Sequence, residues 1–303
     1  MKNKTISICF FLFYFLFLNH FQLSGSQKDS ILIDAFYRNL YDYRFQSADS
    51  VLQVINKQEI SRETKSILQI SYTWWQIISG DNNINKIDSL FKQIDFNISS
   101  IEERDHTSEL TPTDVIQLII LFSYKSRLHN YQNNKLAGFT SFKRSFKYFE
   151  QLVPCDFPDC EMYNFIAGMY YSLGGHMSDQ YSPVYFLYFD KKFADIEKGY
   201  RLLNECSKSQ NNQVRTESIY FLMKLYLEVQ EDPISATWYS KQLVSLYPDN
   251  LVFRYNQILT LHEQGNSVAA DSAYHSLVVR SQNNKQLTTR QKLHFQEEYK
   301  KLH

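Results

Sequence analysis

The sequence predicts an all-α fold, built as an α-solenoid of antiparallel helix pairs. Two observations carry this prediction. The 303 residues include only 8 Gly and 6 Pro, too few for the many turns of a sandwich or barrel. Apolar residues also recur at i, i+3, i+4 and i+7 along nearly the whole chain, the spacing of one face of a helix. We therefore expect long helices joined by short connectors.

The apolar spacing divides the chain into thirteen predicted helices. They cover residues 30–42, 44–56, 61–79, 83–97, 112–131, 134–152, 158–173, 191–208, 212–230, 233–246, 250–264, 266–282 and 286–301. Thr111-Pro112 and Asp232-Pro233 each place a proline at a first helical position. Gly80 and Gly265 stand where helix ends favour a left-handed residue. The charged stretch 102–105 follows a predicted helix and is expected to be a solvated linker.

A repeat of 34 residues is visible near the C-terminus, where segment 217–250 can be superimposed on segment 251–284. Ala236 then falls on Ala270, and Leu243 falls on Leu277. Each copy is expected to form two helices, with the alanine early in the second helix, where a small side chain allows close approach. The last predicted helix, 286–301, has many charged residues and is expected to cap the stack.

These copies resemble the tetratricopeptide repeat family, and the whole chain is similar to exported tetratricopeptide-like proteins of the Bacteroidetes, whose role is mostly unassigned. The match is partial, because Ser240, Arg254 and Gln282 depart from the family pattern. The resemblance implies a superhelical repeat domain over residues 27–303. It implies no activity.

Residues 1–26 have the order of a secretory signal peptide. Lys2 and Lys4 precede an apolar run from Ile6 to Leu18, and small residues lead to a cleavage site after Ser26. The apolar run is too short to span a membrane as a helix, although an uncleaved anchor is the alternative. We expect cleavage near Ser26, and a mature protein in the periplasm or at the cell surface without a transmembrane helix.

The charge balance bears on the partners. The chain has 32 basic and 32 acidic residues, and no dense basic run. Nucleic-acid binding needs a positive surface, so we expect no nucleic-acid partner. A protein or peptide partner fits the repeat architecture better, and any membrane association would come through such a partner.

No local arrangement of residues indicates catalysis. The sequence contains no phosphate-binding glycine loop, no nucleophile elbow and no pair of metal-binding histidines at helical spacing. Its histidines are scattered, whereas a metal site needs several clustered ligands. We therefore expect no enzyme activity, no cofactor and no metal. An enzyme whose site is assembled from distant residues is the remaining alternative.

Two aromatic groups are candidates for partner binding. The first is a predicted loop after Gly174-Gly175 that contains Tyr181, Tyr185 and Tyr188. These rings would line a ligand groove, or would fold into the core as packing, which we favour. The second is Trp74-Trp75, on the predicted helix 61–79. Neighbouring residues point about 100° apart, so one indole is expected in the core. The other would contact a partner or, as we favour, an adjacent helix.

Cys155 and Cys160 flank a short turn-like stretch. An oxidising compartment would permit them to form a disulfide, and two reduced thiols at a helix junction are the alternative that we favour. The sequence as a whole predicts a non-enzymatic scaffold for protein interactions. The first alternative is an accessory protein for assembly or transport at the outer membrane.

Overall fold

The computed structural model describes residues 27–105, 110–152, 161–188 and 190–302, and side chains are described for these except residues 27, 28, 105 and 179–188. The described residues form thirteen α-helices and no strand, which confirms the all-α prediction. Their bounds are α2 Gln27–Tyr41, α3 Phe45–Asn56, α4 Arg62–Ile78, α5 Ile84–Asp105, α6 Pro112–Tyr131, α7 Lys135–Leu152, α8 Glu161–Tyr188, α9 Ile196–Cys206, α10 Asn212–Lys224, α11 Pro233–Leu246, α12 Leu251–Glu263, α13 Ser267–Asn283 and α14 Thr289–Lys300. A 3-10 turn, η1, covers Lys191–Phe193, and a π-helical turn, η2, covers Leu225–Val229.

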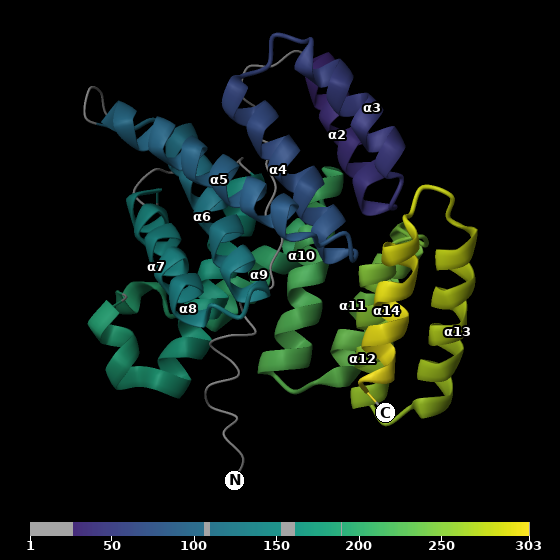
Figure 1. Ribbon diagram of the computed structural model, residues 1–303. Helices are drawn as coiled ribbons and strands as arrows, with labels where there is room; N and C mark the ends of the chain where they lie inside the picture. The colour runs from purple at the N-terminus through teal and green to yellow at the C-terminus, as the bar shows by residue number, and fades with distance from the viewer. Residues whose placement is uncertain (1–26, 106–109, 153–160, 189, 303) are drawn as a thin grey trace. The chain divides into compact units, whose positions relative to one another are not determined.

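The chain forms two compact units. Unit 1 holds residues 91–229 and unit 2 holds residues 27–90 together with 230–302. The boundary between the units at residues 229 and 230 falls inside the repeat copy 217–250, so the 34-residue repeat does not coincide with the units. In both units helices that follow one another in sequence pack as pairs, as Figure 1 shows for α2 with α3.

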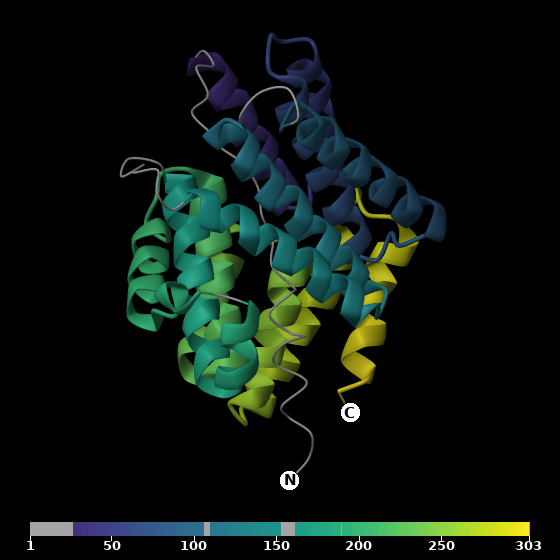
Figure 2. The same cartoon turned by 90° about the vertical axis from the view of Figure 1, so that its left-hand side faces the viewer.

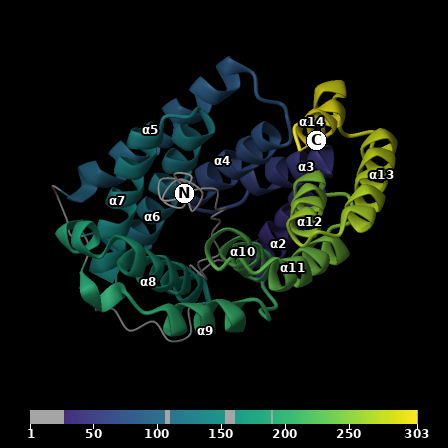
Figure 3. The ribbon, with the colours of Figure 1, turned by 90° about the horizontal axis from the view of Figure 1, so that it is seen from below.

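Unit 1 contains two tight helix pairs, α6 with α7 (Figure 2) and α8 with α9 (Figure 3). In the second pair the backbones approach very closely at glycines. A Cβ atom on Gly199 of α9 would lie 2.4 Å from the backbone nitrogen of Ser172 in α8. A Cβ atom on Gly175 would lie 2.3 Å from Ile196 Cγ1. These glycines therefore permit helix–helix contact where a side chain would be excluded.

The predicted loop after Gly174-Gly175 is wrong, because α8 runs on to Tyr188. The two glycines were interpreted as a helix end, and at least Gly175 serves close packing instead. The predicted helix 191–208 is replaced by η1 and the shorter α9.

The predicted linker 102–105 is also wrong, because these residues form the last turn of α5. Glu102 accepts hydrogen bonds from Arg144 Nη2 at 2.5 Å and from Tyr148 Oη at 2.6 Å, both on α7. Arg104 forms a 2.9 Å ion pair with Asp114 on α6. Glu102 and Arg104 in this last turn thus contact neighbouring helices rather than water alone.

Unit 2 combines both ends of the described chain. Asn250, at the start of α12, contacts Tyr41 at the end of α2, and the Gln286 side chain accepts a hydrogen bond from the backbone N–H of Gln46 at 2.9 Å. In a linear stack each repeat contacts only its neighbours, so these contacts depart from a simple open solenoid. The helices α11, α12 and α13 nevertheless follow one another side by side (Figure 3).

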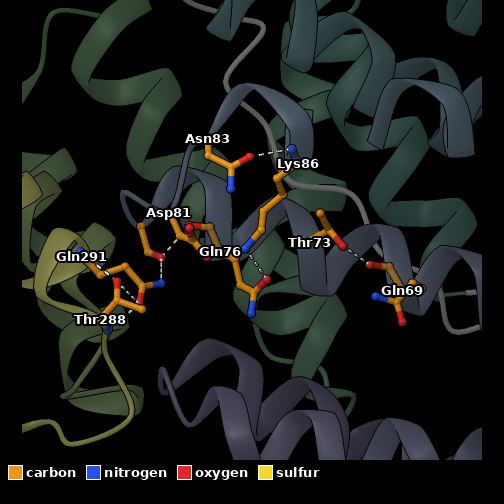
Figure 4. Close-up of polar contacts among 9 residues, drawn as sticks. Gln69, Thr73, Gln76, Asp81, Asn83, Lys86, Thr288 and Gln291 are labelled. Atoms are coloured by element: carbon orange, nitrogen blue, oxygen red, sulfur yellow. Dashed lines mark hydrogen bonds and ion pairs between the residues drawn. The ribbon is translucent and has the colours of Figure 1, made fainter. Parts of the chain in front are cut away.

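Polar contacts also join the end of α4 to α14 (Figure 4). The Gln291 amide donates a 2.6 Å hydrogen bond to Ser79 Oγ, and Gln291 forms a capping box with Thr288. Nearby, Lys86 pairs with Asp81 and donates to Gln76 Oε1 at 3.1 Å. The bond between Gln291 and Ser79 positions the last helix against the turn that contains Gly80.

Candidate functional site

The most prominent candidate site is an outward face on α11 in unit 2. Asp232 caps the helix, accepting hydrogen bonds from the backbone N–H groups of Ile234 and Ser235 at 3.1 Å each. A hydrogen bond with the Ser235 side chain, and then these backbone bonds, lower the pKa of the Asp232 carboxyl. Pro233 occupies the first helical position, as its sequence predicted. The helix start is thus well defined, which fixes where each α11 side chain points.

The inward face of α11 is fixed by small and apolar side chains. Ala236, Ser240 and Leu243 are fully buried, and Ser240 Oγ lies 3.2 Å from Thr260 Oγ1 on α12. The contact between α11 and α12 follows from this face, because Ala236 has no bulk to hold the helices apart. Ala270 is similarly buried on α13. These two alanines are equivalent in the 34-residue repeat.

The outward face carries large apolar side chains. Ile234 is 67% exposed and Trp238 is 59% exposed, and they lie four residues apart, on one side of the helix. Lys241 and Ser245 continue the same exposed line. The Trp238 ring packs edge-on against Tyr239, with 4.6 Å between ring centroids. A tryptophan exposed to this degree is a strong candidate for contact with a partner, because tryptophan is enriched at the energetic centres of interfaces.

Sequence reasoning missed Trp238, although a signal was present. Trp238 lies two residues after Ala236, so it points roughly 200° away from that alanine around the helix. The repeat assigns Ala236 and Leu243 to the packed face. A tryptophan on the opposite face is therefore out of place for core packing, and that position alone could have identified it.

The tryptophans that the sequence singled out, Trp74 and Trp75, are both buried. The Trp75 ring lies edge-on to Tyr41 and to Phe253, at centroid distances of 5.4 and 5.7 Å. It therefore helps join α2, α4 and α12 in the core of unit 2. A partner would reach these indoles only if the helices separated.

The remaining predicted site residues lie outside what the structure describes. This applies to the side chains of Tyr181, Tyr185 and Tyr188, and to both Cys155 and Cys160. Cys206 is buried, and its thiol donates to the carbonyl oxygen of Glu161 at 3.6 Å.

A second, chemically different group lies on α10 in unit 1. Its polar members are spaced at i, i+4, i+7 and i+11 along one face and are all buried: Gln213, Glu217, Tyr220 and Lys224. Lys224 forms a 2.8 Å ion pair with Glu228 in η2. Burial raises the pKa of the Tyr220 hydroxyl, and the charges of Lys224 and Arg127 act in the opposite direction. Two cations and two anions thus converge near this ring.

The α10 group has the composition of a structural ion-pair network. Burial raises the pKa of Glu228 and Lys224 lowers it, so the pair offsets part of the penalty of removing charge from water. π-Helical turns are frequent at functional sites, and η2 adjoins this group. Within the described residues no three His, Cys, Asp or Glu side chains are placed to hold a metal ion.

Comparison with protein families, with curated proteins and with solved structures finds no match to this chain. Within the described part of the chain, no helix is both long and apolar enough to cross a membrane.

Proposed function

We propose that this protein is a non-enzymatic scaffold that binds another protein through the outward face of α11. The exposed pair Ile234 and Trp238 is the observation that carries the proposal. Burying these two large apolar side chains on binding releases their hydration water. The indole of Trp238, carried on a helix, would provide a broad and rigid contact. Lys241 at the end of the face would add an electrostatic contact.

The tetratricopeptide-like architecture is part of this proposal. It is supported by the sequential packing of α11, α12 and α13, and by the equivalent buried alanines Ala236 and Ala270. Repeat arrays use their surfaces for binding extended or folded partners. We also propose export to the periplasm or cell surface, on the order of charged, apolar and small residues within 1–26.

The test uses site-specific photocrosslinking in the producing cell. A benzophenone amino acid replaces Trp238 in the full chain, and a matched probe replaces Val268, which is 82% exposed on α13 of the same unit. We expect a light-dependent adduct from position 238, absent from position 268 and lost when Ile234→Asp is added. Equal labelling at both positions, or no adduct at either, would contradict the proposal.

Cell fractionation with N-terminal sequencing of the mature protein tests export. Recovery in the periplasm or on the surface, with Gln27 at the N-terminus, is the expected result. Recovery with the membranes, released by high salt, would favour the alternative of an accessory protein at the outer membrane. Recovery in the cytoplasm with Met1 intact would refute export.

The buried ionisable group on α10 is the observation that favours an enzyme instead. A Lys224→Met variant separates the two functions, because Lys224 is in the other unit from Trp238. Suppose that the variant folds and keeps the crosslink from position 238, yet fails to complement a strain that lacks the gene for this protein. In that case the α10 group has a role beyond the scaffold. Full complementation would favour the scaffold alone.

A further inference from the structure

Helix α7 carries more net charge than any other described helix. Its four cations, Lys135, Lys143, Arg144 and Lys147, are accompanied by a single acid, Glu150, which leaves a net charge of +3 (four minus one). Every other described helix has a net charge between −2 and +1 when its Lys, Arg, Asp and Glu residues are counted within the bounds given above. The whole chain is neutral, so α7 concentrates positive charge on one part of unit 1.

The outward side of α7 is a row of exposed side chains at i, i+4, i+7 and i+11, a spacing that places them on one side of a helix. We call this row the α7 stripe, and its members are Leu136, Thr140, Lys143 and Lys147. Ser145 and Phe149, on the opposite side of the helix, are fully buried. The packing of that opposite side therefore holds the two lysines out toward solvent.

The turn η1 lies beside α7 and adds two further cations. Its Phe193 is fully buried and contacts Phe146 and Phe149 of α7, with ring centroids 5.4 and 5.3 Å apart. This contact brings the exposed Lys191 and Lys192 to the same part of unit 1. The cations of η1 and of α7 therefore act together on a charged group that approaches.

Three acids lie among these six cations and offset part of their charge. Glu102 pairs with Arg144 at 2.5 Å, and Asp190 pairs with Lys192 at 3.0 Å. Burial raises the pKa of Glu150, while the charge of Lys192 acts in the opposite direction. The surface keeps a net charge of +3 (six minus three), so it attracts anions.

We propose that the α7 stripe and η1 bind the surface of an anionic lipid bilayer directly, without a partner protein. The stripe extends about 16 Å from Leu136 to Lys147, which suits a row of lipid headgroups rather than one small anion. Lysine side chains reach the phosphates through long apolar stems. Leu136 is 78% exposed and would enter the boundary between headgroups and acyl chains.

Leu136 is also the reason to favour a bilayer over an acidic protein as the occupant. An acidic protein would match the charge of the stripe, but it would need an apolar pocket placed opposite this one side chain. A bilayer offers an apolar layer beneath its headgroups at every point of its surface.

The lipid contact is separate from the proposed protein-binding face, because α7 belongs to unit 1 and α11 belongs to unit 2. Each lysine close to an anionic bilayer strengthens binding about fivefold. The attraction is screened beyond about 10 Å at 0.1 M salt. We therefore expect weak binding that becomes weaker as the salt concentration rises.

Co-sedimentation of the mature chain, residues 27–303, with lipid vesicles tests this inference. Vesicles of phosphatidylcholine and phosphatidylglycerol in equal amounts are compared with vesicles of phosphatidylcholine alone, at about 20–300 mM salt. We expect binding only to the anionic vesicles, and less of it at higher salt. The vesicles contain no protein, so binding to them separates direct attachment from attachment through a partner at the outer membrane.

Two sets of variants locate the contact. Lys143→Gln combined with Lys147→Gln is expected to weaken binding about 25-fold, because each lysine contributes about fivefold. Lys57→Gln combined with Lys285→Gln makes the same change in net charge at exposed positions of unit 2, and this control is expected to weaken binding less than about twofold. Leu136→Ser is expected to weaken binding at least about threefold at every salt concentration, because the lost contact is apolar.

Circular dichroism establishes that each variant is folded. The absence of binding to anionic vesicles at low salt overturns the inference. Equal losses in the two double variants also overturn it, because the attraction would then come from the charge of the whole protein. If vesicles do not bind, yet a benzophenone amino acid in place of Lys143 gives a protein adduct in the cell, the stripe binds an acidic protein and the lipid inference falls. The adduct from position 238, which tests the proposed function, is measured separately in each case.

Discussion

The side-chain amide of Asn250 donates a 2.6 Å hydrogen bond to the carbonyl oxygen of Tyr41, which lies 209 residues earlier in the chain. The amide oxygen of the same residue accepts from the backbone N–H of Phe253 at 3.0 Å, capping α12. Asn250 is fully buried. One side chain thus starts a C-terminal helix and holds the end of the first described helix.

We predict that Asn250→Ala destabilises unit 2 by about 2–4 kcal/mol. Loss of the cap accounts for about 1 kcal/mol, and a buried Tyr41 carbonyl without its donor accounts for a further 1–3 kcal/mol. Denaturant unfolding measures the change. Asn266→Ala is the control, because Asn266 caps α13 through Ala269 but is exposed and has no such second bond. Equal losses in the two variants would show that the bond to Tyr41 contributes nothing.

We predict that Gly199→Ala destabilises unit 1, although alanine is the better helix former. The added methyl group would lie 2.4 Å from the Ser172 nitrogen and 2.8 Å from the Gly168 oxygen, both backbone atoms of α8. Forcing the helices apart is expected to cost about 1–3 kcal/mol, more than the 0.5–1 kcal/mol gained in helix propensity. Arg201→Ala, at an exposed position of the same helix, should change stability by less than about 0.5 kcal/mol. A more stable Gly199→Ala would refute the close approach.

We predict that Glu102→Ala destabilises the end of α5 by about 1–2 kcal/mol. The carboxylate accepts from both Arg144 and Tyr148, and its partial exposure reduces the value of these charged hydrogen bonds. Hydrogen exchange of the last α5 turn should increase. The neighbour Glu103 is exposed, so Glu103→Ala is the matched control and is expected to leave exchange unchanged. If both variants exchanged alike, 102–105 would behave as the solvated segment that the sequence first indicated.

We predict that unit 2 loses stability in mild acid through His294. Burial lowers the pKa of this imidazole below 6.5, against the opposing charges of Glu298 and Glu297. Because the unfolded chain then binds the proton more readily, the stabilising contribution is complete above pH 6.5 and is lost as the pH falls below that value. His294→Leu should therefore reduce the slope of unfolding free energy between pH 7.5 and pH 5. His275→Leu, at an exposed position on α13, serves as control. An unchanged slope in His294→Leu would contradict the prediction.

We predict that the thiol of Cys206 resists alkylation in the native protein, because its side chain is buried against the Glu161 carbonyl. Peptide mapping by mass spectrometry, with and without reductant, checks this. The same map decides whether Cys155 and Cys160 pair with each other. Rapid labelling of Cys206 without denaturant would show that α9 opens readily from α8.

The all-α class and most of the helices could be predicted from the sequence alone. Helical periodicity and the caps Thr111-Pro112 and Asp232-Pro233 are local properties, and a stretch of some fifteen residues is enough to express them. The predicted segments 112–131 and 233–246 agree with α6 and α11. The local sequence does not show which helix each packed face contacts. It also does not show whether a glycine ends a helix or lets two helices approach closely.

Tertiary structure decided the rest. Glycine is suited both to ending a helix and to letting two helices touch, and only the position of α9 shows that Gly175 does the second. Trp75 and Trp238 carry the same side chain on similar helices, yet one is enclosed by Tyr41 and Phe253 and the other is exposed. The partners that bury Trp75 come from both ends of the chain. Which faces remain open for binding therefore depends on contacts between residues some two hundred positions apart, which periodicity along the sequence does not encode.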